Sequence, residues 1–227
     1  MHPSNETMRT SDPDSVLDRV RRALGRTKTP RTIPAPPLID ERVVRLVHTD
    51  LGLGELFARR AGEMNMRVTS CYVEECVPKL IEFFVEMRIK RVMLSESSLL
   101  RKLEILPQLR SAGFDAKTWD EITLDESYDF DASVTDAWRA VAETGSLVLR
   151  ASPGHGRAMS LVPVVHVAIV EPRNFVADLL DLFELIAREG VGSATTLISG
   201  PSKTADIEMN VVTGVHGPNV VNAFVLQ

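Results

Sequence analysis

The stretch Val-Val-His-Val-Ala-Ile-Val, residues 164–170, decides the fold class. Five of its seven residues are β-branched and only His166 is polar, so neither face of a strand built from it could lie in water. Such a run is typical of a central strand in a parallel sheet, buried on both faces. Residues 174–189 follow with apolar side chains at helical spacing, and Gly190 ends that pattern.

Strand and helix patterns alternate through most of the chain. Strands are expected at residues 67–70, 91–94, 116–119, 134–135, 146–149, 194–198 and 223–226. Helices are expected at residues 76–89 and 99–112, and a helical turn at residues 137–141. This alternation predicts an α/β fold with a largely parallel sheet flanked by helices.

The first 37 residues differ from the rest in composition and charge. Residues 14–24 have helical spacing, and four prolines between residues 29 and 37 predict an extended linker. Seven Arg or Lys face four acids here, which gives +3 and leaves −8 for the remainder of a chain whose total is −5. We therefore expect a basic N-terminal helix and Pro-rich linker at 1–37, able to dock on a partner, and one α/β domain at 38–227, opening with helical segments between Asp40 and Phe57.

The overall composition excludes several classes of protein. With 44% hydrophobic and 25% charged residues the chain is typical of a globular domain, and its net charge of −5 gives no reason to expect nucleic acid as a partner. No apolar stretch is long enough for a membrane span, and the N-terminus lacks the apolar core of a signal peptide. A cytoplasmic location is therefore expected.

Cys71 and Cys76 are the only cysteines. Two thiols cannot supply the four ligands of a typical iron–sulfur cluster or structural zinc site. We expect both to be free, with Cys76 on the apolar face of a helix, and no cofactor or metal in this chain.

Two polar turns lie close together near the C-terminus: Ser-Gly-Pro-Ser-Lys-Thr-Ala-Asp-Ile-Glu at 199–208 and Gly-Val-His-Gly-Pro at 214–218. The first follows a predicted strand, at the position where loops of parallel sheets bind ligands. Its hydroxyls and exposed N–H groups can hold a carboxylate or phosphate, and glycine allows close approach. The ligand-binding candidates are Ser199, Gly200, Ser202, Lys203, Thr204 and Gly217.

Asp206 and His216 are the ionisable candidates for catalysis in these turns. His216 lies between glycines, where it is accessible for proton transfer, and Asp206 lies nearer the first turn than Glu208 does. The residues alone also fit a simple alternative, in which Ser202 caps a helix and Glu208 is solvated. His155, in a flexible turn, could reach the pocket, whereas His166 is expected to be a core residue.

These two turns, together with Ala-Glu-Thr-Gly-Ser-Leu-Val-Leu at 142–149 and Asp136-Ala137 before it, resemble the LUD-domain family, and within it the lactate utilisation protein C subgroup. The resemblance covers residues 40–227. It implies a fold similar to the ribose-5-phosphate isomerase, glucosamine-phosphate deaminase and CoA-transferase superfamily. It also favours the binding-site interpretation of the turns over simple capping.

The resemblance further implies a function and one more set of site residues. The family is linked to bacterial oxidation of L-lactate to pyruvate, with iron–sulfur clusters on two companion proteins. CoA transferases of the similar fold use a glutamate as nucleophile, which makes Glu143 a catalytic candidate and Thr144 and Gly145 ligand-binding candidates. The sequence fits equally well with a structural role for Glu143, in which it forms an ion pair with Arg150 or Arg157.

The expected function is therefore that of a non-cluster component of an L-lactate utilisation system, which binds a small carboxylate or supports iron–sulfur companion subunits. Whether this chain is itself an enzyme stays open; if it is, it belongs to an L-lactate oxidising complex. The alternatives are a stand-alone enzyme acting on a phosphosugar or acyl-CoA, and a structural or regulatory module docked through the basic arm.

Overall fold

The structure, a computed structural model, describes residues 16–25, 51–205, 211–213 and 216–227. The chain divides into two compact units, Met1–Asp40 and Glu41–Gln227. The first contains helix α1 (Val16–Ala23), close to the helix predicted at 14–24. The boundary predicted after Pro37 and the helical pattern between Asp40 and Asp50 lie outside the described residues.

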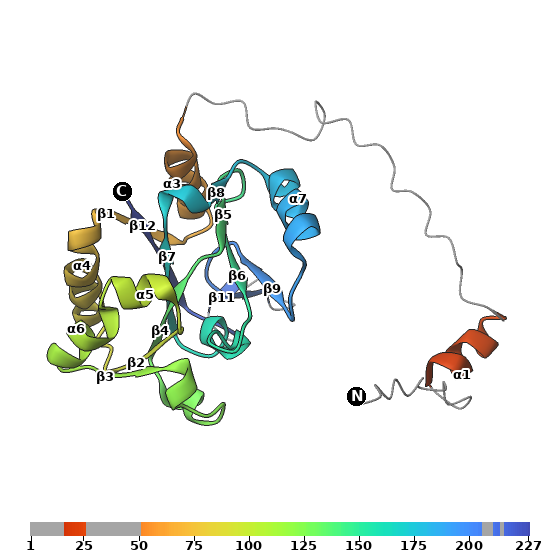
Figure 1. Cartoon of the computed structure of the whole chain (residues 1–227), viewed down its shortest axis with the longest axis horizontal. Coiled ribbons are helices and arrows are strands. Elements are labelled where there is room, and N and C mark those ends of the chain that lie inside the picture. Colours follow the sequence, from red (N-terminus) through yellow and green to blue (C-terminus); the bar gives the residue numbers. More distant parts are fainter. Residues whose placement is uncertain (1–15, 26–50, 206–210, 214–215) are drawn as a thin grey trace, which may run out of the picture. The chain divides into compact units, whose positions relative to one another are not determined.

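A six-stranded parallel sheet forms the centre of the second unit, and the predicted fold class is confirmed (Figure 1). Its order is β1-β12-β7-β4-β2-β3. The strands are β1 (Arg67–Cys71), β2 (Arg91–Leu94), β3 (Asp115–Thr118), β4 (Ala132–Asp136), β7 (Val165–Val170) and β12 (Val220–Leu226). All six residues of β7 are buried between β4 and β12, as the stretch 164–170 predicts.

Alternate residues of the strands pack into two separate hydrophobic cores, one on each face of the sheet. Val165, Val167 and Ile169 pack with three helices, α4 (Val73–Glu86), α5 (Ser98–Lys102) and α6 (Ile105–Ser111). Ala168 and Val170 face the other way, toward α3 (Leu53–Glu63) and a second sheet. Figure 1 shows these layers on opposite sides of the main sheet. Because successive side chains of a strand point to opposite faces, a continuously apolar strand can serve both cores at once.

The second sheet has four strands in the order β8-β5-β6-β9. Its strands are β8 (Phe175–Val176), β5 (Arg139–Val141), β6 (Ser146–Arg150) and β9 (Thr195–Ile198). The helical turn predicted at 137–141 is wrong, because β5 pairs with β6 and β8 and buries Ala140 and Val141 completely. Three residues are too few for a periodic pattern to separate strand from helix.

The helix predicted at 174–189 starts later than expected. Phe175 and Val176 pair with β5, and α7 (Leu179–Glu189) begins only after Asp178, whose carboxylate accepts a hydrogen bond from the Asp181 backbone N–H at 2.9 Å. The helix predicted at 99–112 is divided into α5 and α6 at Glu104, which has a left-handed backbone with φ of 53°. In both places a local break interrupts a continuous apolar pattern.

The strand predicted at 194–198 is present as β9, but it is not part of the parallel sheet. It pairs antiparallel with β6, with Leu147 opposite Ile198. The expectation that residues 199–202 follow a parallel strand is therefore wrong. A short hairpin of β10 (Lys203–Ala205) and β11 (Val211–Thr213) follows.

Four short 3-10 helices complete the described structure: η1 (Trp119–Glu121), η2 (Glu126–Asp129), η3 (Arg157–Ser160) and η4 (Pro172–Asn174). Among the helices of the described residues, none is long and apolar enough to cross a membrane.

Candidate functional site

The direction of the chain through the main sheet reverses between β2 and β4. From β2 the chain continues outward to β3, whereas from β4 it continues the other way, to β7 and then β12. The loops at the carboxyl ends of β2 and β4 therefore leave in opposite directions and open a crevice, the position at which open α/β sheets bind ligands.

A pocket of about 590 Å³ lies at this reversal, and we name it the switch-point pocket. Its lining comes from the carboxyl ends of β4 and β7 and from α5, which follows β2. The lining residues are Ser98, Leu99, Lys102, Asp136, Ala137, Trp138, Arg139, Glu171, Arg173 and Asn174. Three basic side chains and two acidic ones give the pocket an excess of one positive charge.

Asp136 is the last residue of β4 and is half-buried in the pocket wall. Its Oδ1 accepts a hydrogen bond of 3.2 Å from the hydroxyl of Ser95, which is itself held by a backbone bond to Val134. A carboxylate can accept several hydrogen bonds, so one neutral donor leaves Asp136 with further acceptor capacity.

The basic side chains of the pocket differ in their partners. Arg139 contacts Glu189 at 3.4 Å, and Arg173 forms an ion pair with Glu171 at 2.7 Å. Lys102, at the last position of α5, is exposed and has no ion pair within the part of the chain that the structure describes. Among the basic side chains of this pocket, Lys102 can therefore bind an anion without giving up an ion pair that the structure describes.

Two guanidinium groups lie close to the ring of Trp138, which is part of the pocket lining. The Arg150 Cζ lies 3.3 Å from its ring centroid and that of Arg139 lies 4.7 Å away. Glu189 accepts hydrogen bonds from both arginines, so one carboxylate fixes both cations over the ring. This arrangement places Arg150 with Glu189 and not with Glu143, as one sequence interpretation allowed.

Two histidines, His155 and His166, are buried in the described part of the chain. His155 is 8% exposed; burial lowers its pKa, while the negative charge of Asp136 acts in the opposite direction. His166 is completely buried, and its Nε2 lies 2.9 Å from the Thr135 hydroxyl oxygen. Burial, with a smaller effect of His155, lowers the pKa of His166 to about 3, so it stays neutral. His166 is a core residue, as predicted.

The predicted residues of the 142–149 and 199–208 motifs meet through their hydroxyls. The Ser146 hydroxyl oxygen lies 2.7 Å from that of Thr144 and 2.6 Å from that of Ser199. Gly145 and Gly200 both have positive φ, and a Cβ on either would collide with backbone atoms near the end of α3, at Ala61 and Met64. These glycines therefore permit close packing against α3.

The 216–218 turn lies against the same loop. The Ser202 backbone N–H donates to the Pro218 carbonyl at 2.9 Å, and a Cβ on Gly217 would lie 3.2 Å from that of Ser202. Lys203 donates to the Met64 carbonyl at 3.4 Å. The backbone of Thr204 is part of β10, whereas Asp206 and Glu208 lie outside the described residues.

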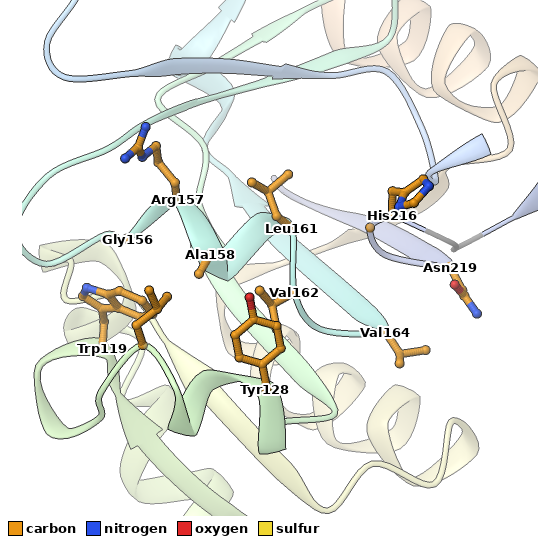
Figure 2. A pocket seen from close by; sticks show the side chains of 12 residues that line it. Trp119, Tyr128, Gly156, Arg157, Ala158, Leu161, Val162, Val164, His216 and Asn219 are labelled. Carbon is orange, nitrogen blue, oxygen red and sulfur yellow. The ribbon is translucent and has the colours of Figure 1, made fainter. Parts of the chain in front are cut away.

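His216 and Gly217 line a different pocket, of about 870 Å³, at the amino ends of β7 and β12. Figure 2 shows Trp119 and His216 on opposite sides of this amino-end pocket, with Leu161 and Val162 between them. Several exposed apolar side chains lie in its wall: Leu124, Tyr128, Leu161 and Val164. His216 itself is exposed.

Glu143 lies apart from both pockets. It is half-buried, and its backbone N–H donates to the Ala177 carbonyl at 3.0 Å. Within the described residues its carboxylate has neither a hydrogen bond nor an ion pair, and it is not among the lining residues of the switch-point or amino-end pocket. Its predicted role as nucleophile stays a prediction.

Sequence reasoning missed Ser95, Lys102 and Arg173 as candidates. The polar run Ser-Glu-Ser-Ser at 95–98 directly follows a predicted strand and was the available signal. It carries no glycine turn, and the strand order that places it beside Asp136 cannot be obtained from a local pattern.

Comparisons with known proteins agree with this architecture. The sequence model of the LUD domain matches residues 54–226. Lactate utilization protein C of Bacillus pumilus (strain SAFR-032) is 27% identical over 223 residues, which cover 90% of this chain and 92% of that protein. Proteins of the same name from Exiguobacterium sp. and Bacillus subtilis (strain 168) are 41% and 33% identical, over 40% and 52% of their own lengths.

A solved structure supports the fold. The crystal structure of a DUF162 family protein from Deinococcus radiodurans has a TM-score of 0.58 and 22% sequence identity, and the match covers 78% of this chain and 99% of that one. The likeness extends over most of the second unit and shows a shared α/β architecture.

Proposed function

Since this chain belongs to the LUD-domain family, we propose that it is the non-cluster component of an L-lactate utilisation system and that it binds a small carboxylate. Relatives named lactate utilization protein C support a role in lactate utilisation. In this proposal, iron–sulfur clusters lie on companion subunits and this chain supplies the carboxylate site.

One observation carries the carboxylate-binding part: Lys102 lines the switch-point pocket and has no ion pair within the described residues. The hydroxyl-rich motif loops are less open to a ligand, because Thr144, Ser146 and Ser199 are bonded to one another and both neighbouring glycines pack on α3. We therefore propose that the carboxylate binds in the switch-point pocket.

The site residues predicted from sequence stay a separate proposal, for a second site in the motif loops and not for the switch-point pocket, whose described lining contains none of them. Glu143, Asp206 and His216 are the proposed catalytic groups, and the proposed ligand-binding residues are Thr144, Gly145, Ser199, Gly200, Ser202, Lys203, Thr204 and Gly217. Contacts between Ser146 and Ser199, and between Ser202 and Pro218, support treating the three motif segments as one functional unit.

A thermal-shift screen tests ligand binding. A ligand present at one hundred times its Kd adds about 2.7 kcal/mol to the free energy of unfolding. L-lactate, pyruvate and acetate are compared with ribose 5-phosphate and coenzyme A at equal ionic strength. Stabilisation by the small carboxylates is expected, and a flat response to all of them would contradict the proposal.

A growth experiment tests the role in the cell. Deleting the gene is expected to slow growth on L-lactate as sole carbon source and to leave growth on glucose unchanged, with recovery when the gene is restored. Co-purification with cysteine-rich companion proteins from lactate-grown cells tests the proposed partners. Normal growth of the deletion strain on L-lactate would exclude the role.

The alternative is a stand-alone enzyme on a phosphosugar or acyl-CoA. The observation in its favour is the amino-end pocket, which at about 870 Å³ is the larger of the two and carries Arg157 and His216 in its lining. Stabilisation by ribose 5-phosphate or coenzyme A, with none by lactate or pyruvate, would select this alternative in the same screen.

A further inference from the structure

We infer that the switch-point pocket is selective for 2-hydroxycarboxylates over 2-oxocarboxylates, with Lys102 binding the carboxylate and Asp136 accepting a hydrogen bond from the 2-hydroxyl group. This inference rests on the proposed function, because it assigns the substrate class and the contacts of the carboxylate site proposed above.

Asp136 is held in place as a hydrogen-bond acceptor. It ends β4, and the backbone N–H of the next residue, Ala137, donates to the Ile169 carbonyl of β7 at 2.9 Å. On the side chain, the Ser95 hydroxyl occupies Oδ1 at 3.2 Å. The remaining acceptor positions of a carboxylate can take a hydrogen bond from a ligand hydroxyl.

The same carboxylate disfavours a keto acid. The 2-oxo group of pyruvate is an acceptor only and has no hydrogen to give to Asp136. Two acceptor groups placed side by side repel each other, and the carboxylate loses water without gaining a bond. Sites built to bind a substrate hydroxyl reject analogues that lack it more strongly than apolar pockets reject a change of size.

Lys102 is the basic group that can bind the ligand's carboxylate. The ion pairs of Arg139 with Glu189 and of Arg173 with Glu171 already engage the other two cations of the pocket. Lys102 is therefore the basic side chain of the described lining that is left to pair with a ligand, which matches a monoanion. A doubly charged phosphate ester would leave a negative charge uncompensated beside Asp136 and Glu171.

The walls of the pocket determine which side chains a bound 2-hydroxycarboxylate can carry. Leu99, Ala137 and Trp138 supply apolar surface beside the charged groups. At about 590 Å³ the pocket is open enough for a side chain longer than the methyl group of lactate. L-lactate and L-2-hydroxybutyrate are therefore both expected to bind, with similar affinities.

Isothermal titration calorimetry of the full chain tests the inference. The ligands are L-lactate, L-2-hydroxybutyrate and pyruvate, titrated into wild type, Asp136→Asn and Lys102→Gln. Lys90→Gln and Asp115→Asn serve as matched controls, because both residues are exposed and outside the pocket lining. Wild type and both controls are expected to bind the two hydroxy acids at least tenfold more tightly than pyruvate.

The two pocket variants are expected to act differently. Lys102→Gln should weaken the binding of lactate and of pyruvate by a similar factor, about tenfold. The substitution removes the contact with the carboxylate group, which both ligands share. Asp136→Asn removes most of the preference for lactate, because the neutral amide can donate to the keto oxygen. Its oxygen still accepts from Ser95, and thermal unfolding of the variant checks the fold.

The outcomes separate the two levels of inference. Binding of lactate and pyruvate with equal affinity by wild type would overturn the selectivity while leaving carboxylate binding in place. Lys102 is exposed, so replacing it by Gln does not endanger the fold. If Lys102→Gln leaves the affinity for lactate unchanged, the ligand does not bind in the switch-point pocket. Failure of every carboxylate to bind wild type would overturn the proposed function, and this inference with it.

Discussion

The hydroxyl oxygens of Ser146 and Ser199 lie 2.6 Å apart, although 53 residues separate them along the chain. Ser146 begins β6 and is almost completely buried, and Ser199 directly follows β9, its antiparallel partner. The pair thus joins two distant motif segments at the edge of the second sheet.

Replacing Ser199 by Ala should lower the free energy of unfolding by about 1 kcal/mol, because the buried Ser146 hydroxyl loses one partner. The remaining bond to Thr144 limits the loss. Urea denaturation of S199A, S146A and the double variant measures the coupling between the two residues. Strictly additive losses would show that the hydrogen bond contributes nothing.

Gly145→Ala should be strongly destabilising. Its backbone has φ of +63°, and a Cβ would collide with the Ala61 backbone. Gly113→Ala is the matched control, since Gly113 also has positive φ, +92°, but no neighbouring atom lies within 4 Å of the position that a Cβ would take there. The control should lose about 1–2 kcal/mol from backbone strain alone, and G145A clearly more. Equal losses for both variants would contradict the close packing against α3.

His166 should make the protein less stable in mild acid. The unfolded chain binds a proton on this histidine below about pH 6.5, whereas in the folded state its pKa is lowered to about 3. Protons therefore favour the unfolded state, and the free energy of unfolding falls between pH 6.5 and pH 3. The loss is about 2 kcal/mol at pH 5 relative to pH 8.

A variant isolates this contribution from that of other groups. His166→Gln keeps a partner for the Thr135 hydroxyl but does not titrate. Urea denaturation at pH 5 and pH 8 should show a smaller loss in the variant than in wild type. An identical pH dependence in the two proteins would show that His166 does not control it.

Cys71 and Cys76 should be unreactive in the native protein. Their side chains are 2% and 0% exposed, and burial raises the pKa of both thiols, that of Cys76 to about 12. The reactive thiolate is therefore scarce at pH 8. Ellman's reagent should react with two thiols per chain in guanidinium chloride and only slowly without it. Rapid native reaction would show that this edge of the sheet opens readily.

His216 should affect function without affecting stability. Its side chain is exposed in the lining of the amino-end pocket, so His216→Asn leaves the core intact. If it has the proposed catalytic role, the variant should fail to restore growth of the deletion strain on L-lactate while keeping the wild-type melting temperature. Full restoration of growth would remove His216 from the catalytic candidates.

Local patterns predicted most of the strands, including the short one at 91–94, but not the break at Glu104 in the helix predicted at 99–112 or the late start of α7. The strand at 164–170 has a continuous apolar pattern that few other environments accept, and it forms the fully buried β7. Residues 137–141 and 174–176 are too short for periodicity, and pairing between β5 and β8 fixes them. The strand predicted at 194–198 belongs to the second sheet and not to the parallel sheet, because β9 pairs with β6.

For the candidate site, sequence reasoning identified motif residues that meet near the amino ends of the strands, but not the switch-point pocket at the carboxyl ends of β4 and β7. Glycines and hydroxyls are uncommon in a packed core, so the motifs have a local signature; Ser146 contacts Ser199, and Ser202 contacts Pro218. Ser95, Lys102 and Asp136 have no local signature that links them. Their proximity follows from the order of β2 and β4 in the sheet.

The sequence by itself determined the class of fold and the buried character of its central strand, since both depend on how apolar and polar side chains alternate over a few residues. Only the tertiary structure decided which strand ends meet, which cations of the switch-point pocket are engaged in ion pairs and which glycines touch helix α3. Those properties depend on strand order and on contacts between segments far apart in the chain, and no local pattern encodes them.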